Sequence, residues 1–238
     1  SMAANESNQE TKTTVLEKLE KINLDNYTLS EMSEVIEKTV RDKSNPISIS
    51  VDGANNLNSV TVLNKDGTKT LHIFPYDIKY VEDDHIKFIS DKISSSDNKE
   101  YEYQNDDGNL SRSFSEDPET GVELSYKDYT VELAPLANQK KMISSKNITL
   151  NNISEVTFEK DENSITYDNI FTNNIEIKYT SAINGIKEDI ILSKYEGINT
   201  FYFTINTNGL VPEIMKADQR AISLLDPDTS EVAMVIGQ

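Results

Sequence analysis

The chain of 238 residues contains no cysteine, no tryptophan and only two histidines. Without cysteine, disulfide scaffolds, thiol nucleophiles and thiolate zinc sites are all excluded. Without tryptophan, the chain also lacks an aromatic residue that often accompanies sugar-cleaving carboxylates. Histidine is the side chain that most often transfers protons near neutral pH, so its scarcity leaves few candidates for acid–base catalysis.

Basic residues are scarce as well. The 23 Lys and Arg residues stand against 41 Asp and Glu residues, which gives a formal net charge of −18. Such a charge repels phosphate backbones and anionic lipids, so we expect no nucleic-acid partner and no membrane insertion. No stretch approaches the roughly 18 apolar residues that a transmembrane helix needs. The acidic side chains are interpreted as a solubilising surface, with binding of cations or of basic partners as the alternative.

The pattern of apolar residues changes twice along the chain. Residues 1–12 are polar, begin with what reads as a cloning remnant, and are expected to be disordered. Apolar residues at helical spacing then predict a helical segment over 13–45, in which Thr28 and Glu31 are placed as a capping box. Pro46 ends this segment, and alternation of apolar with polar residues follows.

Residues 46–238 have the pattern of antiparallel strands joined by short turns. Turn-forming sequences separate the alternating runs at 64–67, 105–108, 127–128, 184–185, 208–209 and 226–230. The predicted fold is therefore mainly β, an antiparallel β-sandwich preceded by a short helical segment. One extended sandwich and two packed sandwiches both fit, and a seam between two would lie near 138–146, where the sequence becomes polar and basic.

No recognised catalytic motif is present. The chain has no nucleophile elbow, phosphate-binding loop, dinucleotide fingerprint or zinc-protease motif. His72 lies inside a strand pattern and His85 in an acidic run, so both are interpreted as structural. The chain is predicted not to be an enzyme, with no catalytic residue and no cofactor. A glycoside hydrolase or lyase that uses two carboxylates remains an alternative, because carboxylates are abundant.

Two sets of residues are candidates for binding. Tyrosine rings can stack on sugars, although tyrosines in alternating strands more often pack against one another. Clustered carboxylates in the loops 105–109 and 226–231 could bind calcium, although neither loop has the EF-hand pattern. The ligand-binding candidates are Tyr101, Tyr103, Tyr126 and Tyr129, and the calcium candidates are Asp106, Asp107, Asp226 and Asp228.

Several segments of the chain resemble large surface proteins of Gram-positive bacteria. The stretches are NIEIKYT at 174–180, NGIKEDIIL at 184–192, NGLVP at 208–212 and SLLDPDTSEV at 223–232. Upstream, NKDGT at 64–68 and IFPY at 73–76 are similar to an opening hairpin of the same proteins. Together they resemble the N-terminal β-rich module of wall-associated proteins with RHS/YD repeats or DNRLRE domains.

This resemblance implies an extracellular, wall-associated module without known catalytic residues, whose partners are other domains of its parent protein. The sequence departs from the family pattern, because it lacks the tryptophan often found after the opening hairpin. The leading hypothesis is a non-catalytic structural or display module. A carbohydrate-binding module that recognises cell-wall or host glycans is the alternative.

Overall fold

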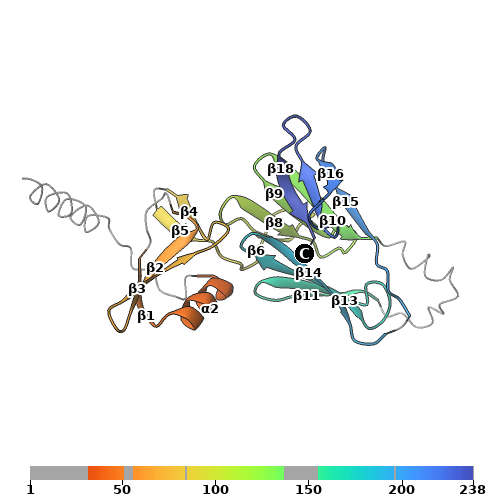
Figure 1. Cartoon of the computed structure of the whole chain (residues 1–238). Helices are drawn as coiled ribbons and strands as arrows, with labels where there is room; N and C mark the ends of the chain where they lie inside the picture. Colours follow the sequence, from red (N-terminus) through yellow and green to blue (C-terminus); the bar gives the residue numbers. More distant parts are fainter. Residues whose placement is uncertain (1–31, 51–55, 84, 137–154, 196, 238) are drawn as a thin grey trace, which may run out of the picture. The chain divides into compact units, whose positions relative to one another are not determined.

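The computed structural model describes residues 32–50, 56–83, 85–136, 155–195 and 197–237 (Figure 1). The protein is mainly β, with one short helix among these residues and antiparallel pairing in every sheet. The predicted antiparallel β architecture is confirmed. The chain divides into two compact units, 1–89 and 90–238. The predicted disordered tail, capping box and seam at 138–146 lie outside the described residues.

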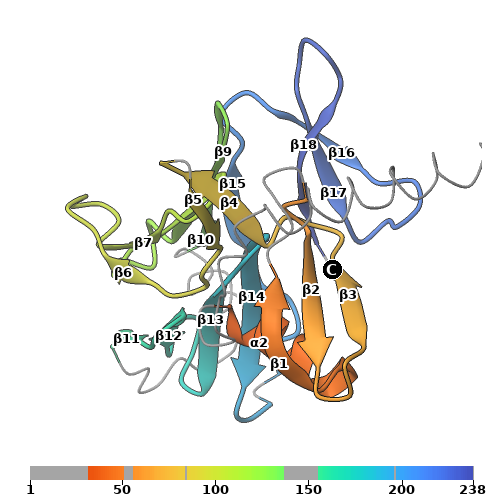
Figure 2. The same ribbon diagram turned by 90° about the vertical axis from the view of Figure 1, so that its left-hand side faces the viewer.

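The first unit packs the helix α2 (Glu34–Lys43) with a three-stranded sheet. The sheet has the order β1 (Pro46–Ser50), β2 (Ser59–Asn64), β3 (Lys69–Ile73), and Figure 2 shows its strands side by side. The helix buries Ile36 and Val40, while its exposed side carries two ion pairs at i, i+4 spacing. A separate hairpin, β4 (Lys79–Glu82) with β5 (His85–Phe88), completes the described part of this unit.

The second unit is built on a six-stranded antiparallel sheet. Its order is β15-β10-β9-β8-β7-β6, so the strand β15 joins from a distant part of the sequence. The bounds are β6 (Ser94–Ser95), β7 (Tyr103–Asn105), β8 (Leu110–Phe114), β9 (Val122–Tyr126), β10 (Tyr129–Pro135) and β15 (Phe203–Asn206).

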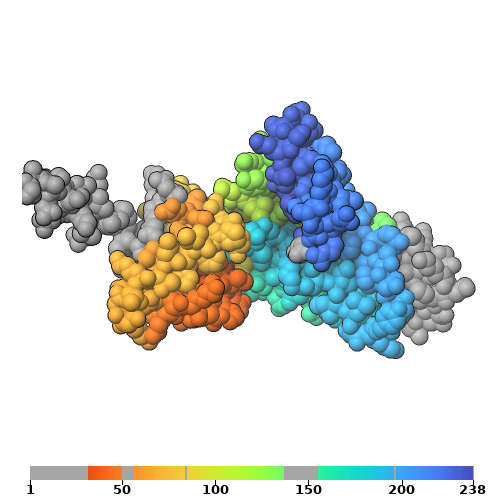
Figure 3. All heavy atoms as spheres, in the orientation of Figure 1, coloured from red at the N-terminus to blue at the C-terminus, as the bar shows by residue number. Residues whose placement is uncertain are grey.

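Two smaller sheets pack against this six-stranded sheet. The four-stranded sheet consists of β11 (Thr157–Lys160), β12 (Ser164–Asp168), β13 (Ile175–Ala182) and β14 (Gly185–Leu192). The three-stranded sheet consists of β16 (Val211–Ile214), β17 (Ile222–Leu225) and β18 (Val232–Ile236), which Figure 3 shows in blue at the surface.

The main core joins the six-stranded and four-stranded sheets. Phe114 and Val122 of the larger sheet pack with Ile165, Tyr167 and Ile177 of the smaller one. In β13 every second side chain is buried, so the predicted period of two is followed over the whole strand. A second cluster places Val131 of β10 against Leu224 and Met234 of the three-stranded sheet. These two interfaces give the unit its layered, sandwich-like packing.

A fully buried arginine ties the two main sheets together. Arg112 of β8 donates hydrogen bonds to the carbonyl oxygens of Ala182 (2.8 Å) and Ile183 (3.0 Å), at the turn between β13 and β14. It also donates to Oδ1 of Asn105 and to the carbonyl oxygen of Asp107. Burial lowers the pKa of Arg112 to about 10, which still leaves the guanidinium charged at neutral pH.

The predicted turns mostly join paired strands. The sequences at 64–67, 105–108, 127–128, 184–185 and 226–230 lie between strands that pair with each other, so these hairpins are confirmed. The turn at 208–209 differs, because the strands on either side of it belong to different sheets. The strand β15 pairs with β10, and β16 pairs with β17.

Candidate functional site

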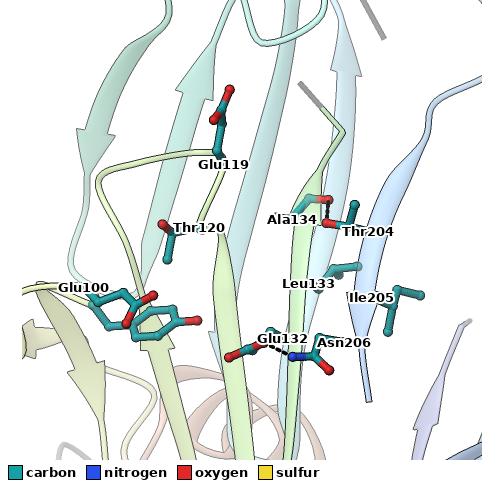
Figure 4. A pocket seen from close by; sticks show the side chains of 10 residues that line it. Glu100, Glu119, Thr120, Glu132, Leu133, Ala134, Thr204, Ile205 and Asn206 are labelled. Carbon is teal, nitrogen blue, oxygen red and sulfur yellow. Dashed lines mark hydrogen bonds between the residues drawn. The ribbon is translucent and has the colours of Figure 1, made fainter. Parts of the chain in front are cut away.

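An acidic pocket of about 290 Å³ lies at the β15 edge of the six-stranded sheet. Figure 4 shows three of its carboxylates, Glu100, Glu119 and Glu132, arranged around it together with Asn206. The remaining lining residues are Tyr101, Thr120, Leu133, Ala134, Thr204 and Ile205. The lining comes from the segment before β7, the turn between β8 and β9, and the strands β10 and β15.

A row of polar residues crosses the sheet beside this pocket. Strand pairing places Ser113 opposite Glu123, Glu123 opposite Glu132, and Glu132 opposite Asn206. Residues directly opposite in antiparallel strands share a face, so these side chains lie on the face opposite the core-facing Phe114 and Val122. Asn206 Nδ2 donates a hydrogen bond to Glu132 Oε2 over 2.6 Å and holds that carboxylate in place.

The carboxylates of the pocket crowd one another. Burial raises the pKa of Glu123, and the negative charges of Glu132 and Glu100 raise it further. Burial also raises the pKa of Tyr101, with Glu123, Glu132 and Glu100 adding to the effect. None of the ion pairs in the described part of the chain includes Glu100, Glu119, Glu123 or Glu132. The pocket therefore holds several carboxylates that no cation of the described residues pairs with.

A tight turn brings Glu119 and Thr120 to the rim. The backbone N–H groups of Thr120 and Gly121 donate to the carbonyl oxygen of Asp117, and the Asp117 side chain accepts from the N–H of Glu119. Gly121 has a φ of +73°, and a Cβ there would collide with the backbone of Leu133 and Ala134 on β10. Glycine is therefore required both by the backbone conformation and by the close approach of the turn to β10.

The four candidate tyrosines do not form a single surface. Tyr101 is buried and lines the pocket. Tyr103 stacks on Phe158, with ring centroids 5.7 Å apart. Tyr126 and Tyr129 both pack against the second core cluster, and the Tyr129 hydroxyl donates to Asp226 Oδ2 over 2.7 Å. The structure thus brings only one of the four to the pocket.

The calcium candidates act as turn residues in the structure. Asp106 Oδ1 accepts from the Ser111 hydroxyl, and Asp107 Oδ2 accepts from the Ser90 N–H. Asp226 Oδ1 accepts the backbone N–H groups of Asp228 and Thr229. The hydrogen bond from Tyr129, followed by these backbone bonds, lowers the pKa of Asp226 to about 2. Among the described residues, no group of three or more His, Asp or Glu side chains is arranged to hold a metal ion.

The two histidines lie apart from the pocket's residues in the sequence and in their contacts. His72 is buried on β3, and its Nε2 lies 3.1 Å from the Ser44 hydroxyl. Burial, followed by the charge of Lys43, lowers the pKa of His72. His85 is exposed at the start of β5.

The described residues include no helix that is long and apolar enough to cross a membrane.

Sequence reasoning did not single out the glutamates of the pocket. Glu123 and Glu132 occupy the polar positions of ordinary alternating strands, and 41 acidic residues offered no way to choose among them. The sequence does predict that the two strands around the turn at 127–128 pair with each other. The register of that pair places Glu123 and Glu132 opposite each other. Glu100 and Glu119 lie outside strands, where the sequence gives no register.

No known protein family and no solved structure matches the chain. The chain is similar to the tRNA(Glu)-specific nuclease WapA of Bacillus subtilis subsp. natto (strain BEST195), with 25% identity over 138 residues. The matched region is 58% of this chain and 6% of that protein. This finding corrects the prediction that the protein is not an enzyme, because the relative is a nuclease. Sequence motifs could not anticipate this similarity, because a motif identifies only catalytic residues that have a fixed local spacing.

Proposed function

We propose that the chain is part of a tRNA-cleaving nuclease of the bacterial cell surface, and that its sheets form the module by which this protein is displayed there. The observation that carries the proposal is the similarity to WapA, a nuclease of which the matched region is a small part. Nuclease activity and cell-surface location are tested by separate experiments.

The geometry of the second unit supports a display role. Its layered sheets bury a continuous aromatic core, in which Tyr167 meets Tyr179 edge to face and Phe171 meets Phe203 in the same way. The segments at 174–180 and 184–192, which resemble wall-associated proteins, form the hairpin β13–β14 beside this core. A folded module of this kind can space other domains along a protein.

The display role is tested by sedimentation with isolated Gram-positive cell walls. The full chain is mixed with walls at several salt concentrations, and the bound fraction is measured after centrifugation. Saturable binding supports display, and competition by soluble wall oligosaccharides would show that the module recognises the wall glycan itself. Recovery of the chain in the supernatant at every salt concentration would contradict display.

The nuclease part is tested separately. The full-length gene product that carries these residues is incubated with tRNA(Glu) and, as a control, with tRNAs of other acceptor specificity. We expect cleavage of tRNA. Intact tRNA under conditions in which the protein is folded would contradict the nuclease activity. The same assay on the chain alone shows whether these residues are sufficient for cleavage.

A further inference from the structure

A tyrosine hydroxyl opens onto the acidic pocket. Tyr101 is 5% exposed as a whole residue, but its hydroxyl is not among the fully buried unpaired polar atoms of the described residues, so water in the pocket reaches it. A ligand that displaces this water can take over its hydrogen bond. The side chain lines the pocket together with Glu100 and Glu132, so a ligand in the pocket is placed to bond with it.

The pocket's charges define the chemistry of that ligand. Glu100, Glu119 and Glu132 line the pocket, and Glu123 lies next to Glu132 on the neighbouring strand. Like charges directly opposite each other in a sheet repel, so a cation placed between them is favoured. The arrangement does not suit a metal ion, because no metal-binding group of carboxylates exists among the described residues. An organic cation fits better, since its donors spread over a larger volume.

We propose that this pocket binds the guanidinium group of an arginine side chain from a partner protein. A guanidinium presents five N–H donors in one plane and can reach acceptors on several elements at once. The acceptors available are the carboxylates of Glu100 and Glu132, the hydroxyl of Tyr101 and the second lone pair of Asn206 Oδ1, which already accepts the N–H of Asn208. Asn206 is already oriented, because its Nδ2 is held by Glu132.

The position of the pocket in the sheet identifies the partner as an extended protein segment. The strand β15 forms the last strand of the six-stranded sheet, and Thr204, Ile205 and Asn206 of this strand line the pocket. The outer edge of β15 can pair with an added strand, as sheet edges commonly do in peptide recognition. A basic segment is attracted to this acidic surface, whereas the phosphates of a nucleic acid are repelled.

Calorimetric titration of the full chain tests this assignment. The probes are three tripeptides blocked at both ends, whose central residue is arginine, lysine or citrulline, the neutral isostere of arginine. The arginine peptide is expected to bind more tightly than the lysine peptide, and the citrulline peptide is expected to give no heat. Absence of binding by the arginine peptide, or equal binding by the citrulline or lysine peptide, would overturn the proposal.

Matched variants locate the binding. Glu132→Gln removes one charge-assisted acceptor and is expected to weaken the arginine peptide by roughly tenfold. Tyr101→Phe keeps the ring and removes only the hydroxyl, with an expected loss of roughly threefold. Glu213→Gln changes an exposed glutamate of β16 outside the pocket and is expected to change the affinity by less than roughly twofold.

The pattern among the variants decides the outcome. Equal weakening by Glu132→Gln and Glu213→Gln would show attraction to the overall acidic surface and would refute a built site. Thermal unfolding of each variant shows whether it is folded, and the isosteric changes at Glu132 and Tyr101 keep the packing. Chitotriose is titrated as a neutral sugar. If it binds wild type, loses affinity in Glu132→Gln and the arginine peptide does not bind, the pocket recognises a sugar instead.

Discussion

Replacing Gly121 by alanine should destabilise the second unit far more than the same change at Gly209. Both glycines have positive φ, +73° and +97°, so alanine is strained at each by about 1–2 kcal/mol. They differ in surroundings. A Cβ at Gly121 would collide with the carbonyl oxygen of Leu133 and approach the Cα of Ala134 within 2.8 Å, whereas nothing lies within 4 Å of a Cβ at Gly209.

The collision at Gly121 involves backbone atoms, which cannot rotate away. Overpacking of this kind costs about 1–3 kcal/mol in addition to the conformational strain. We therefore expect a loss of about 2–5 kcal/mol in the free energy of unfolding for Gly121→Ala and about 1–2 kcal/mol for Gly209→Ala. The close approach of the turn to β10 is the only difference on which this contrast depends.

Urea unfolding of the full chain measures both effects. Because the chain has 11 tyrosines and no tryptophan, tyrosine fluorescence and far-ultraviolet circular dichroism are the suitable signals. The two units can unfold in separate transitions, so each curve is fitted for both. Equal midpoints for the two variants would refute the close contact between the β8–β9 turn and β10. A small loss in Gly121→Ala alone would show that β10 moves to accept the methyl group.

Three further predictions concern buried or paired polar groups. Arg112→Met should lower the free energy of unfolding by about 3–5 kcal/mol in urea, because strand-end carbonyls and the Asn105 amide lose their partner. Tyr129→Phe should raise the pKa of Asp226 from about 2 toward its ordinary value, because the carboxylate loses a hydrogen-bond donor. That hydrogen bond stabilises the protein above the unfolded pKa of Asp226, and the stabilisation is lost as pH falls through the folded pKa. Nuclear magnetic resonance titration of Asp226 measures the shift. Glu123 has a raised pKa, so it favours folding at low pH and opposes it as pH rises through the folded pKa. Glu123→Gln should flatten this part of the plot of stability against pH. An unchanged plot would contradict the crowding of its charge.

The strands were largely predictable because one face of each sheet is buried. In β13 the alternation of Ile175, Ile177 and Tyr179 with polar residues is visible in the sequence and is followed in the structure. Turns with a glycine or asparagine at positive φ were equally readable, as at Gly67 and Gly108. Local pattern and local backbone chemistry agree at these places, so the sequence alone is sufficient.

Pairing between distant strands could not be predicted. Phe203 and Ile205 show that β15 is a strand, but no local feature indicates that it pairs with β10. The buried position of Arg112 was equally hidden, because an arginine in an alternating strand is normally exposed. The pocket depends on both kinds of information. Its carboxylates converge only after β9, β10 and β15 are aligned in register.

The position of β15 in the sheet has a consequence for how the chain assembles. Ala134 of β10 meets Thr204 of β15 across 70 residues, and the whole β11–β14 sheet lies between them in sequence. Joining such distant segments requires a large loss of chain entropy, whereas the β11–β14 meander forms from neighbouring segments. During synthesis the hydrogen-bonding groups along the β10 edge remain available until β15 has emerged. The rate at which β15 pairs with β10, more than the stability of any hairpin, therefore governs how long the nascent protein can pair with another copy along this edge.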